Sequence, residues 1–166
     1  MKKIIFILLF TICNFLIAQN KQLRTFPDME SKLDTRFPIE NFKDQYGNNF
    51  SPDYLKGKYT LINLWSTTCA PCLREIPLLN SFKSSLPDVN FVGITYDKKE
   101  KIDNFLLKNK FDFIQIPDAG KELESYLEIQ RFPMTLLVNK EGIITDVIGH
   151  ITEEKLPGIR EKLTGK

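Results

Sequence analysis

The sequence predicts an α/β domain in which a central mixed sheet is flanked by helices. Short runs of β-forming residues alternate along the chain with segments whose apolar residues recur every three or four positions, as in strands and amphipathic helices. Near the end of the chain, two strand-like runs flank a turn at 139–142 and predict an antiparallel hairpin. A chain of 166 residues is long enough for one hydrophobic core but not for two, so we expect one domain.

The first 19 residues have the layout of a secretory signal peptide. Lys2 and Lys3 precede an apolar run that is shorter than the ~20 residues that a membrane-spanning helix needs. We therefore expect 1–19 to be removed, leaving a periplasmic or otherwise exported protein with no stable insertion in the membrane. Cys13 follows the bulky Ile12, whereas lipoprotein signals have a small residue there, so lipoprotein anchoring is not expected.

Residues 20–36 are polar and show no regular period, which predicts an N-terminal arm before a single domain over 37–166. Without the signal peptide, the chain has equal numbers of basic and acidic residues. A neutral chain has no general attraction for nucleic acid or for anionic lipid, and we expect neither as a partner. We expect the protein to be a monomer.

The expected elements follow in chain order. A turn signal at 46–49 between apolar residues predicts a small N-terminal β-hairpin within 37–58. Buried strands are expected at 59–65, 90–96, 111–116, 134–138 and 143–148. Helices are expected from Cys69 to about residue 87 with a kink at Pro77, at 97–108, at 121–128, and from near Thr152 or Pro157 onward. Asp97 and Glu100 form the capping signal of the second helix.

Two cysteines remain after removal of the signal peptide, and they form the motif Cys69-Ala70-Pro71-Cys72. A bridge across two residues restricts the unfolded chain little, so stabilisation is a poor explanation for the pair. The motif follows a buried strand and opens a helix, whose positive end stabilises a thiolate. The spacing therefore predicts a redox-active disulfide in which Cys69 attacks and Cys72 resolves the mixed disulfide.

A metal site is the alternative for a cysteine pair. A closed zinc site needs four ligands, and the single histidine, His150, lies far from the motif along the chain. Redox chemistry is therefore favoured, and we expect no metal and no cofactor. His150 follows the last strand, where we expect a surface or loop residue and not a catalyst.

The segment 64–77 reads Leu-Trp-Ser-Thr-Thr-Cys-Ala-Pro-Cys-Leu-Arg-Glu-Ile-Pro and resembles the active-site segment of the TlpA/ResA branch of the thioredoxin superfamily. The resemblance extends over 37–150 and includes the run Phe132-Pro133-Met134-Thr135. It implies a thioredoxin-like fold with an inserted helix-strand unit at about 98–116. It also implies the activity of an exported protein disulfide oxidoreductase.

The resemblance assigns roles to three further residues, and Trp65 is a fourth candidate. Pro133 matches a cis proline opposite the dithiol, beside which the backbone of Phe132 meets an extended substrate; an ordinary trans proline is the alternative. Glu75 matches an active-site glutamate that exchanges protons with the cysteines, and a solvated first-turn glutamate is the alternative. Trp65 is either a substrate-binding residue or a core residue at the end of a buried strand.

Two positions depart from the family pattern. Thr68 stands where many relatives carry a tryptophan, so the usual flat aromatic docking surface is not expected here. Asn63 stands where minimal thioredoxins carry a buried aspartate, so a proton relay should depend on Glu75 instead.

The resemblance implies cysteine-containing exported proteins as substrates, with apocytochrome c as one typical client, and a membrane thiol electron donor as partner. Reduction is the usual direction in this branch, although the residues between the cysteines do not determine the reduction potential. Two other functions stay open. A copper-binding assembly factor would favour three residues between the cysteines, and a peroxiredoxin-like thiol peroxidase would favour threonine where this chain has Ser66.

Overall fold

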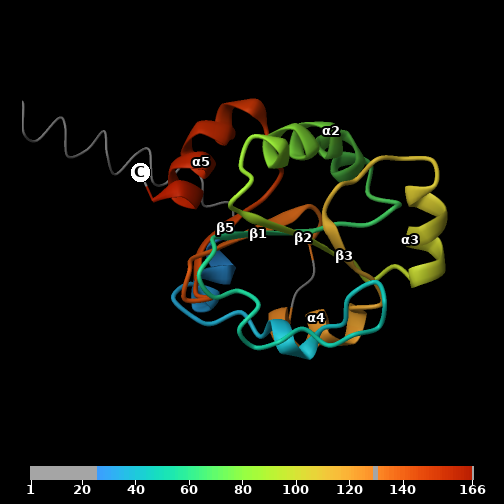
Figure 1. Ribbon diagram of the computed structural model, residues 1–166, viewed down its shortest axis with the longest axis horizontal. Coiled ribbons are helices and arrows are strands. Elements are labelled where there is room, and N and C mark those ends of the chain that lie inside the picture. Colours follow the sequence, from blue (N-terminus) through green and yellow to red (C-terminus); the bar gives the residue numbers. More distant parts are fainter. Residues whose placement is uncertain (1–25, 129–130, 166) are drawn as a thin grey trace, which may run out of the picture.

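The computed structural model of the protein describes residues 26–128 and 131–165, in which a five-stranded sheet lies between two layers of helices (Figure 1). The strands are β1 (Thr60–Leu64), β2 (Asn90–Ile94), β3 (Ile114–Ile116), β4 (Met134–Val138) and β5 (Ile144–Ile148). The α-helices are α2 (Ala70–Ser84), α3 (Lys99–Leu106), α4 (Gly120–Leu127) and α5 (Leu156–Thr164). Three short 3-10 helices are η1 (Pro27–Lys32), η2 (Ile39–Asn41) and η3 (Glu153–Lys155). The predicted signal peptide and residues 20–25 of the predicted arm lie outside the described residues.

The strand order of the sheet is β3-β2-β1-β4-β5, which places β1 at its centre. β1, β2 and β3 run parallel, whereas β4 is antiparallel to both β1 and β5. The predicted mixed sheet and the predicted final hairpin are therefore confirmed. Leu64 at the end of β1 pairs with Met134 at the start of β4. The chain thus leaves β1 for α2 beside the segment that leads into β4.

Helices cover both faces of the sheet. α2 and α5 lie on one face, and α4 and the N-terminal segment lie on the other (Figure 1). Successive side chains of β1 and of Trp65 directly after it alternate between the two layers, as in any strand. Leu61 and Trp65 pack beneath α2. Ile62 and Leu64 pack on the α4 side. Both faces of this strand are therefore buried, which explains its continuous apolar sequence.

The prediction of an N-terminal β-hairpin within 37–58 is correct for the turn but wrong for the two strands. A single bridge joins Lys43 and Asn49 around that turn. Ile39 and Phe42 are both buried, and a strand would point two residues at this spacing to opposite faces. A helical turn brings both of them to the same core, so the segment forms η2 instead of a strand.

The helix-strand unit predicted at about 98–116 is present as α3 and β3, but α3 begins later than expected. No side chain caps α3, so the capping role predicted for Asp97 is wrong. The carboxylate of Asp97 instead accepts a hydrogen bond from the backbone N–H of Thr67 at 2.7 Å. Because β1 and β2 are parallel, their carboxyl ends meet, and this brings Asp97 to the loop that follows β1.

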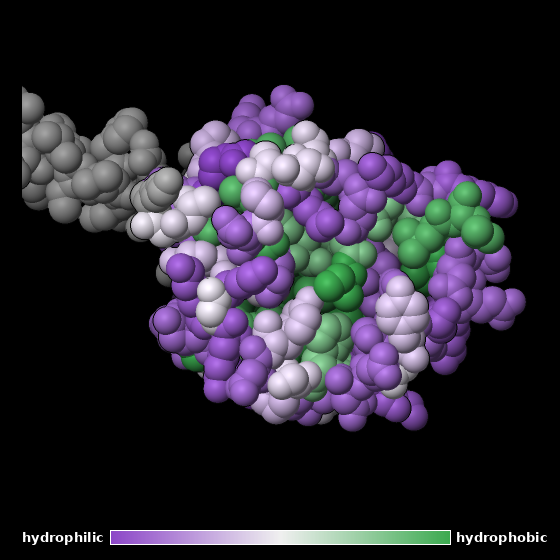
Figure 2. Space-filling model, viewed as in Figure 1, coloured by the Kyte–Doolittle hydropathy of each residue, from purple (hydrophilic) through white to green (hydrophobic). Residues whose placement is uncertain are grey.

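The surface is largely hydrophilic on the face shown in Figure 2, where apolar residues gather in the middle, between α2 and α4, and again near α3. The exposed apolar residues include Leu107, at the end of α3, and Ile114, on the edge strand β3. Within 26–128 and 131–165, every helix is too short or too polar to span a membrane.

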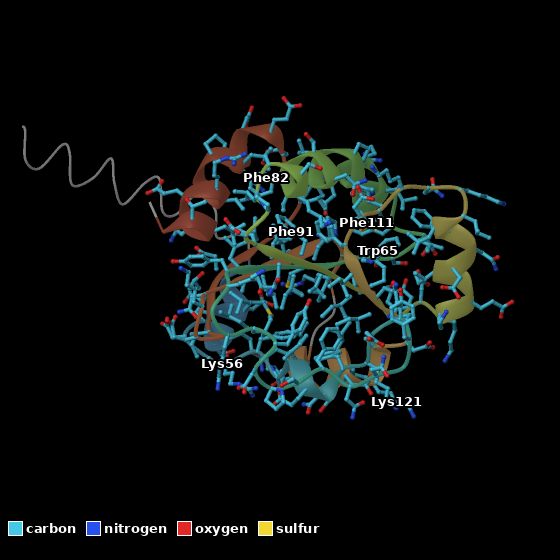
Figure 3. All side chains as sticks on the ribbon, in the orientation of Figure 1. Lys56, Trp65, Phe82, Phe91, Phe111 and Lys121 are labelled. Atoms are coloured by element: carbon cyan, nitrogen blue, oxygen red, sulfur yellow. A yellow bond between two sulfur atoms is a disulfide. The ribbon has the colours of Figure 1, made fainter. Side chains whose placement is uncertain are left out.

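An aromatic cluster fills the layer between the sheet and α2, where Figure 3 labels Trp65, Phe82, Phe91 and Phe111. Trp65 and Phe111 meet edge to face with their ring centroids 5.0 Å apart. The indole N–H of Trp65 donates to Oε1 of the buried Gln115 at 3.0 Å. Gly93 lies directly under this pair. Because glycine has no side chain, Trp65 and Gln115 can pack closely against its backbone.

We expect Gly93→Ala to lower the free energy of unfolding by about 1–3 kcal/mol, as overpacking of a core does. An added Cβ would lie 2.7 Å from Oε1 of Gln115 and 3.1 Å from Nε1 of Trp65, and both atoms would have to move. Equilibrium unfolding in urea measures the change. Gly120→Ala is the matched control, because its Cβ would meet Tyr96 at 3.4 Å, an ordinary contact. Equal stability of the two variants would contradict the prediction.

Candidate active site

Cys69 and Cys72 form a disulfide bond across the first turn of α2, with their Cα atoms 5.2 Å apart. Cys69 is the N-cap residue of α2, and its Sγ accepts a hydrogen bond from the backbone N–H of Cys72 at 3.2 Å. Pro71 occupies the first turn, where helical amides have no intrahelical partner and a proline costs little. When the disulfide is reduced, the same N–H and the positive end of the helix stabilise a thiolate at Cys69.

The two sulfur-bearing residues differ in their access to solvent. Cys72 is buried, with 1% of its surface exposed, whereas Cys69 is partly exposed and lies between the exposed Thr68 and Ala70. A second protein can therefore approach Cys69 without displacing the layer beneath α2. Cys72 can be reached only by groups of the protein itself, such as Sγ of Cys69.

The loop before the dithiol is held by Asp97. Oδ2 of this buried carboxylate accepts hydrogen bonds from N and Oγ1 of Thr67, at 2.7 and 2.9 Å, and from Oγ of Ser66 at 3.1 Å. Lys101 contacts the other oxygen at 2.7 Å. Burial alone would raise the pKa of Asp97, but these hydrogen bonds outweigh it and hold the pKa below its usual value.

Glu75 lies one turn after Cys72 on α2 and is buried, with 2% of its surface exposed. Oε1 accepts a hydrogen bond from Nδ2 of Asn63 at 3.0 Å, and Oε2 accepts one from the backbone N–H of Ile151 at 2.9 Å. Burial raises the pKa of Glu75 from 4.5 to about 7, because the two hydrogen bonds and the positive charge of Lys155 offset it only in part. The alternative of a solvated first-turn glutamate is therefore wrong.

Asn63 connects three elements at this point. Its amide donates to Glu75 on α2 and to Oγ1 of Thr135 on β4, the latter at 3.1 Å. Asn63 and Thr135 are paired residues of neighbouring strands and lie on the same face of the sheet. The carboxyl of Glu75 is therefore held against the centre of the sheet.

His150 follows β5 and faces the same carboxyl. Its Nε2 lies 3.8 Å from Oε2 of Glu75, and 44% of its side chain is exposed. The residue is thus in a loop, as expected, but it also reaches the buried acid. Burial first, and then the positive charges of Lys155 and Arg74, lower the pKa of His150 below its usual value.

The peptide bond between Phe132 and Pro133 is cis. Pro133 is buried directly before β4, and Phe132 is partly buried against the hydrophobic clusters on both faces of the sheet. The ring of Phe132 meets the ring of Tyr96, with centroids 5.2 Å apart. Tyr96 is 40% exposed, and its hydroxyl lies 3.0 Å from Oγ of Ser66, within hydrogen-bond distance. An exposed aromatic edge thus adjoins the loop before the dithiol.

A thioredoxin-like family model matches residues 57–144, a range that includes the dithiol, Glu75 and the Phe132–Pro133 pair. The chain belongs to this thioredoxin-like family. The resemblance to the ResA branch is confirmed by thiol-disulfide oxidoreductase ResA of Bacillus cereus (strain ZK / E33L), which is 29% identical over 125 residues. That match covers 73% of this chain and 72% of the relative.

Solved structures agree with this assignment. StoA from Bacillus subtilis is 25% identical, with a TM-score of 0.60 over 79% of this chain and 98% of that chain. The thioredoxin domain of a thiol-disulfide oxidoreductase from Bacteroides vulgatus is 26% identical, with a TM-score of 0.62 over 73% of this chain and 89% of that one. This thioredoxin-like protein is a thiol–disulfide oxidoreductase.

The structure corrects the substrate-binding role that was predicted for Trp65. Its side chain is completely buried and its only polar atom is bonded to Gln115, so it offers no surface to a substrate. The alternative of a core residue is the correct one. In the described part of this thioredoxin-like chain, no group of three or more His, Cys, Asp and Glu side chains is placed to hold a metal ion.

Sequence reasoning missed three residues around the dithiol. They are Tyr96, Asp97 and His150, which come from strand ends and loops that lie far from the motif along the chain. One signal for Asp97 was present, because polar residues directly after neighbouring parallel strands meet at one edge of a sheet. No comparable signal marked Tyr96 or His150, because the positions of their side chains depend on the paths of the loops that follow β2 and β5.

We expect the free energy of unfolding of the wild-type protein to fall, relative to that of Glu75→Gln, as the pH rises from about 4.5 to about 7. An acid whose pKa is raised on folding stabilises the protein fully below its unfolded pKa and loses this contribution as the pH rises through its folded pKa. The maximum slope is about 1.4 kcal/mol per pH unit.

Urea unfolding of both proteins between pH 4 and pH 8 measures this difference. Glu141→Gln, at an exposed glutamate in the turn between β4 and β5, is the control and should follow the wild type. Parallel curves for the wild type and Glu75→Gln would show that the prediction is wrong.

Proposed function

We propose that the protein is exported and that it reduces disulfide bonds in other exported proteins, with Cys69 as the attacking and Cys72 as the resolving cysteine. The observation that carries the two cysteine roles is their different exposure to solvent. Cys69 is partly exposed, whereas Cys72 is 1% exposed. An attacking thiol must meet the substrate, and a resolving thiol must meet only the first cysteine.

The reaction has two steps. The Cys69 thiolate attacks one sulfur of the substrate disulfide, so that a mixed disulfide forms and the second substrate sulfur leaves as a thiolate. Cys72 then loses its proton and attacks Sγ of Cys69, which releases the first substrate sulfur. Two electrons pass from the dithiol to the substrate, and the protein is left with the Cys69–Cys72 disulfide. A membrane thiol electron donor restores the dithiol.

Glu75 is the proposed base for the second step. Residues three apart on a helix lie on the same face, so the carboxyl of Glu75 and the thiol of Cys72 both lie beneath α2. A carboxyl whose pKa is about 7 takes up and releases a proton readily at neutral pH. In the reverse direction, the protonated Glu75 returns the proton to Cys72.

The exposed aromatic edge is the proposed substrate surface. Phe132 and Cys69 both pack against the hydrophobic cluster beneath α2, and the Tyr96 hydroxyl lies within hydrogen-bond distance of Ser66 in the preceding loop. An extended segment of the substrate would pair with the backbone of Phe132 next to Pro133 and place a side chain against the two rings. This surface would take the role of the tryptophan that many relatives carry at the position of Thr68.

The clients are proposed to be cysteine-containing exported proteins, with apocytochrome c as one of them, which places the protein in cytochrome c biogenesis. The charged and then apolar layout of 1–19 supports export. All residues used in the reaction lie in one chain, so a monomer is sufficient. The site needs no cofactor, because the sulfurs themselves carry the electrons.

Cys72→Ser should accumulate a mixed disulfide between Cys69 and a substrate protein, because the resolving step is lost. Insulin serves as the substrate, and mass spectrometry of the acid-quenched reaction identifies the adduct. Both Cys72→Ser and Cys69→Ser should reduce insulin at least about 100-fold more slowly than the wild type, but Cys69→Ser should form no adduct. An adduct of equal yield in the two variants would reverse or reject the assigned order.

The direction of electron flow is tested by equilibrating the dithiol with glutathione. A reductant should have a potential below about −200 mV, in the range of thioredoxins and glutaredoxins. A potential near the roughly −120 mV of strong oxidants would contradict the reducing role and leave the exchange chemistry in place.

Phe132→Ala and Tyr96→Ala should each raise KM for insulin about tenfold, which corresponds to the loss of one buried aromatic contact of about 1.4 kcal/mol. The reaction with oxidised glutathione should stay within about twofold of the wild type, since this small disulfide does not reach the aromatic edge. Tyr46→Ala is the matched control, because Tyr46 is 78% exposed on the N-terminal turn. An unchanged KM in both variants would remove this surface from the substrate site.

A further inference from the structure

The carboxyl of Glu75 has no direct path to water. Its side chain is fully buried, and its two oxygens accept hydrogen bonds from the amide of Asn63 and the backbone N–H of Ile151. Both donors are amide groups, which keep their protons at neutral pH. A base that takes a proton from Cys72 in each cycle must lose it again, so another group is needed to carry it to solvent.

His150 is placed to carry that proton. Its Nε2 lies 3.8 Å from Oε2 of Glu75, while 44% of its side chain is exposed. An imidazole accepts a proton at one nitrogen and releases a proton from the other, so it can connect a buried acid with water. The separation is longer than a hydrogen bond, and a small rotation of the half-exposed ring or one bridging water closes it.

The charges around the pair keep this imidazole free to accept a proton. Lys155 donates to the backbone carbonyl of His150 at 2.6 Å, and Arg74 on α2 is the second cation that acts on the ring. Together with burial, they lower the pKa of His150 below its usual value. The strands beneath contribute the neutral Asn63 and Thr135. These surroundings therefore favour the neutral imidazole, which has one ring nitrogen free to accept a proton.

We propose that His150 relays protons between Glu75 and solvent. The proposal rests on the proposed role of Glu75 as the base for Cys72. When Cys72 attacks Cys69, its proton moves to a carboxylate oxygen of Glu75, and Nε2 of His150 then takes it. The imidazolium releases a proton from Nδ1 to water, which restores the neutral ring. No electrons move in this relay, because oxidation and reduction stay with the sulfurs.

The test compares His150→Gln and His150→Ala with the wild type in the full chain. The readout is the single-turnover rate of oxidation of the reduced protein by oxidised glutathione between pH 6 and pH 9. We expect His150→Gln to be at least about fivefold slower near pH 7, with an unchanged reduction potential. Imidazole added to the buffer should restore the rate of His150→Ala and leave the wild-type rate unchanged.

Two controls separate the relay from other effects. Lys121→Gln removes an exposed positive charge on α4, which covers the other face of the sheet, and its rate should stay within about twofold of the wild type. Adding His150→Gln to Glu75→Gln should slow the reaction no further than Glu75→Gln alone, because both residues act in one path.

The outcomes distinguish the relay from the proposed function. A wild-type rate in His150→Gln together with a slow Glu75→Gln overturns the relay and leaves the role of Glu75 intact. Wild-type rates in both variants overturn the role of Glu75 and the relay with it. A shifted reduction potential in His150→Gln without rescue by imidazole would assign His150 to electrostatic tuning of the site and reject the relay.

Discussion

The pairing of β1 with β2 on one side and with β4 on the other decides where each residue of the site lies. β1 ends at Leu64, directly before the loop that carries the dithiol. Its parallel neighbour ends at the same edge and brings Asp97 to that loop. Its antiparallel neighbour begins there and brings Phe132 and Pro133. One central strand therefore assembles three segments that are far apart in the sequence.

The layer beneath α2 combines a hydrophobic core with a buried acid. Asn63 and Thr135 point into this layer from adjacent strands, and the amide of Asn63 bonds the Glu75 carboxyl. Burying an unpaired polar group costs several kcal/mol, roughly 2–7, so each of these groups has a partner. The same enclosure raises the pKa of Glu75 toward neutrality, which suits a group that exchanges protons with a thiol.

The surroundings of the dithiol separate its two proposed tasks. Cys72 and Glu75 are enclosed beneath α2, where the proton is exchanged. Cys69 is partly exposed next to the aromatic edge of Tyr96 and Phe132, where a partner protein can bind. Thr68 contributes no ring to this surface, so the aromatic contact comes from the ends of other segments. His150 provides the remaining connection, from the enclosed acid to solvent.

Local patterns along the chain are sufficient to predict the α/β class, the order of the strands and helices, and the position of Cys69 and Cys72 at the start of a helix. These features depend on local periodicity and on residue types at short spacing, which tertiary contacts seldom override when the pattern is strong. Three features could not be predicted from such patterns: Trp65 is a core residue, Asp97 holds the dithiol loop instead of capping α3, and His150 faces Glu75. Each of these depends on which strand ends and loops meet at one edge of the sheet, and such long-range pairings leave no period in the chain.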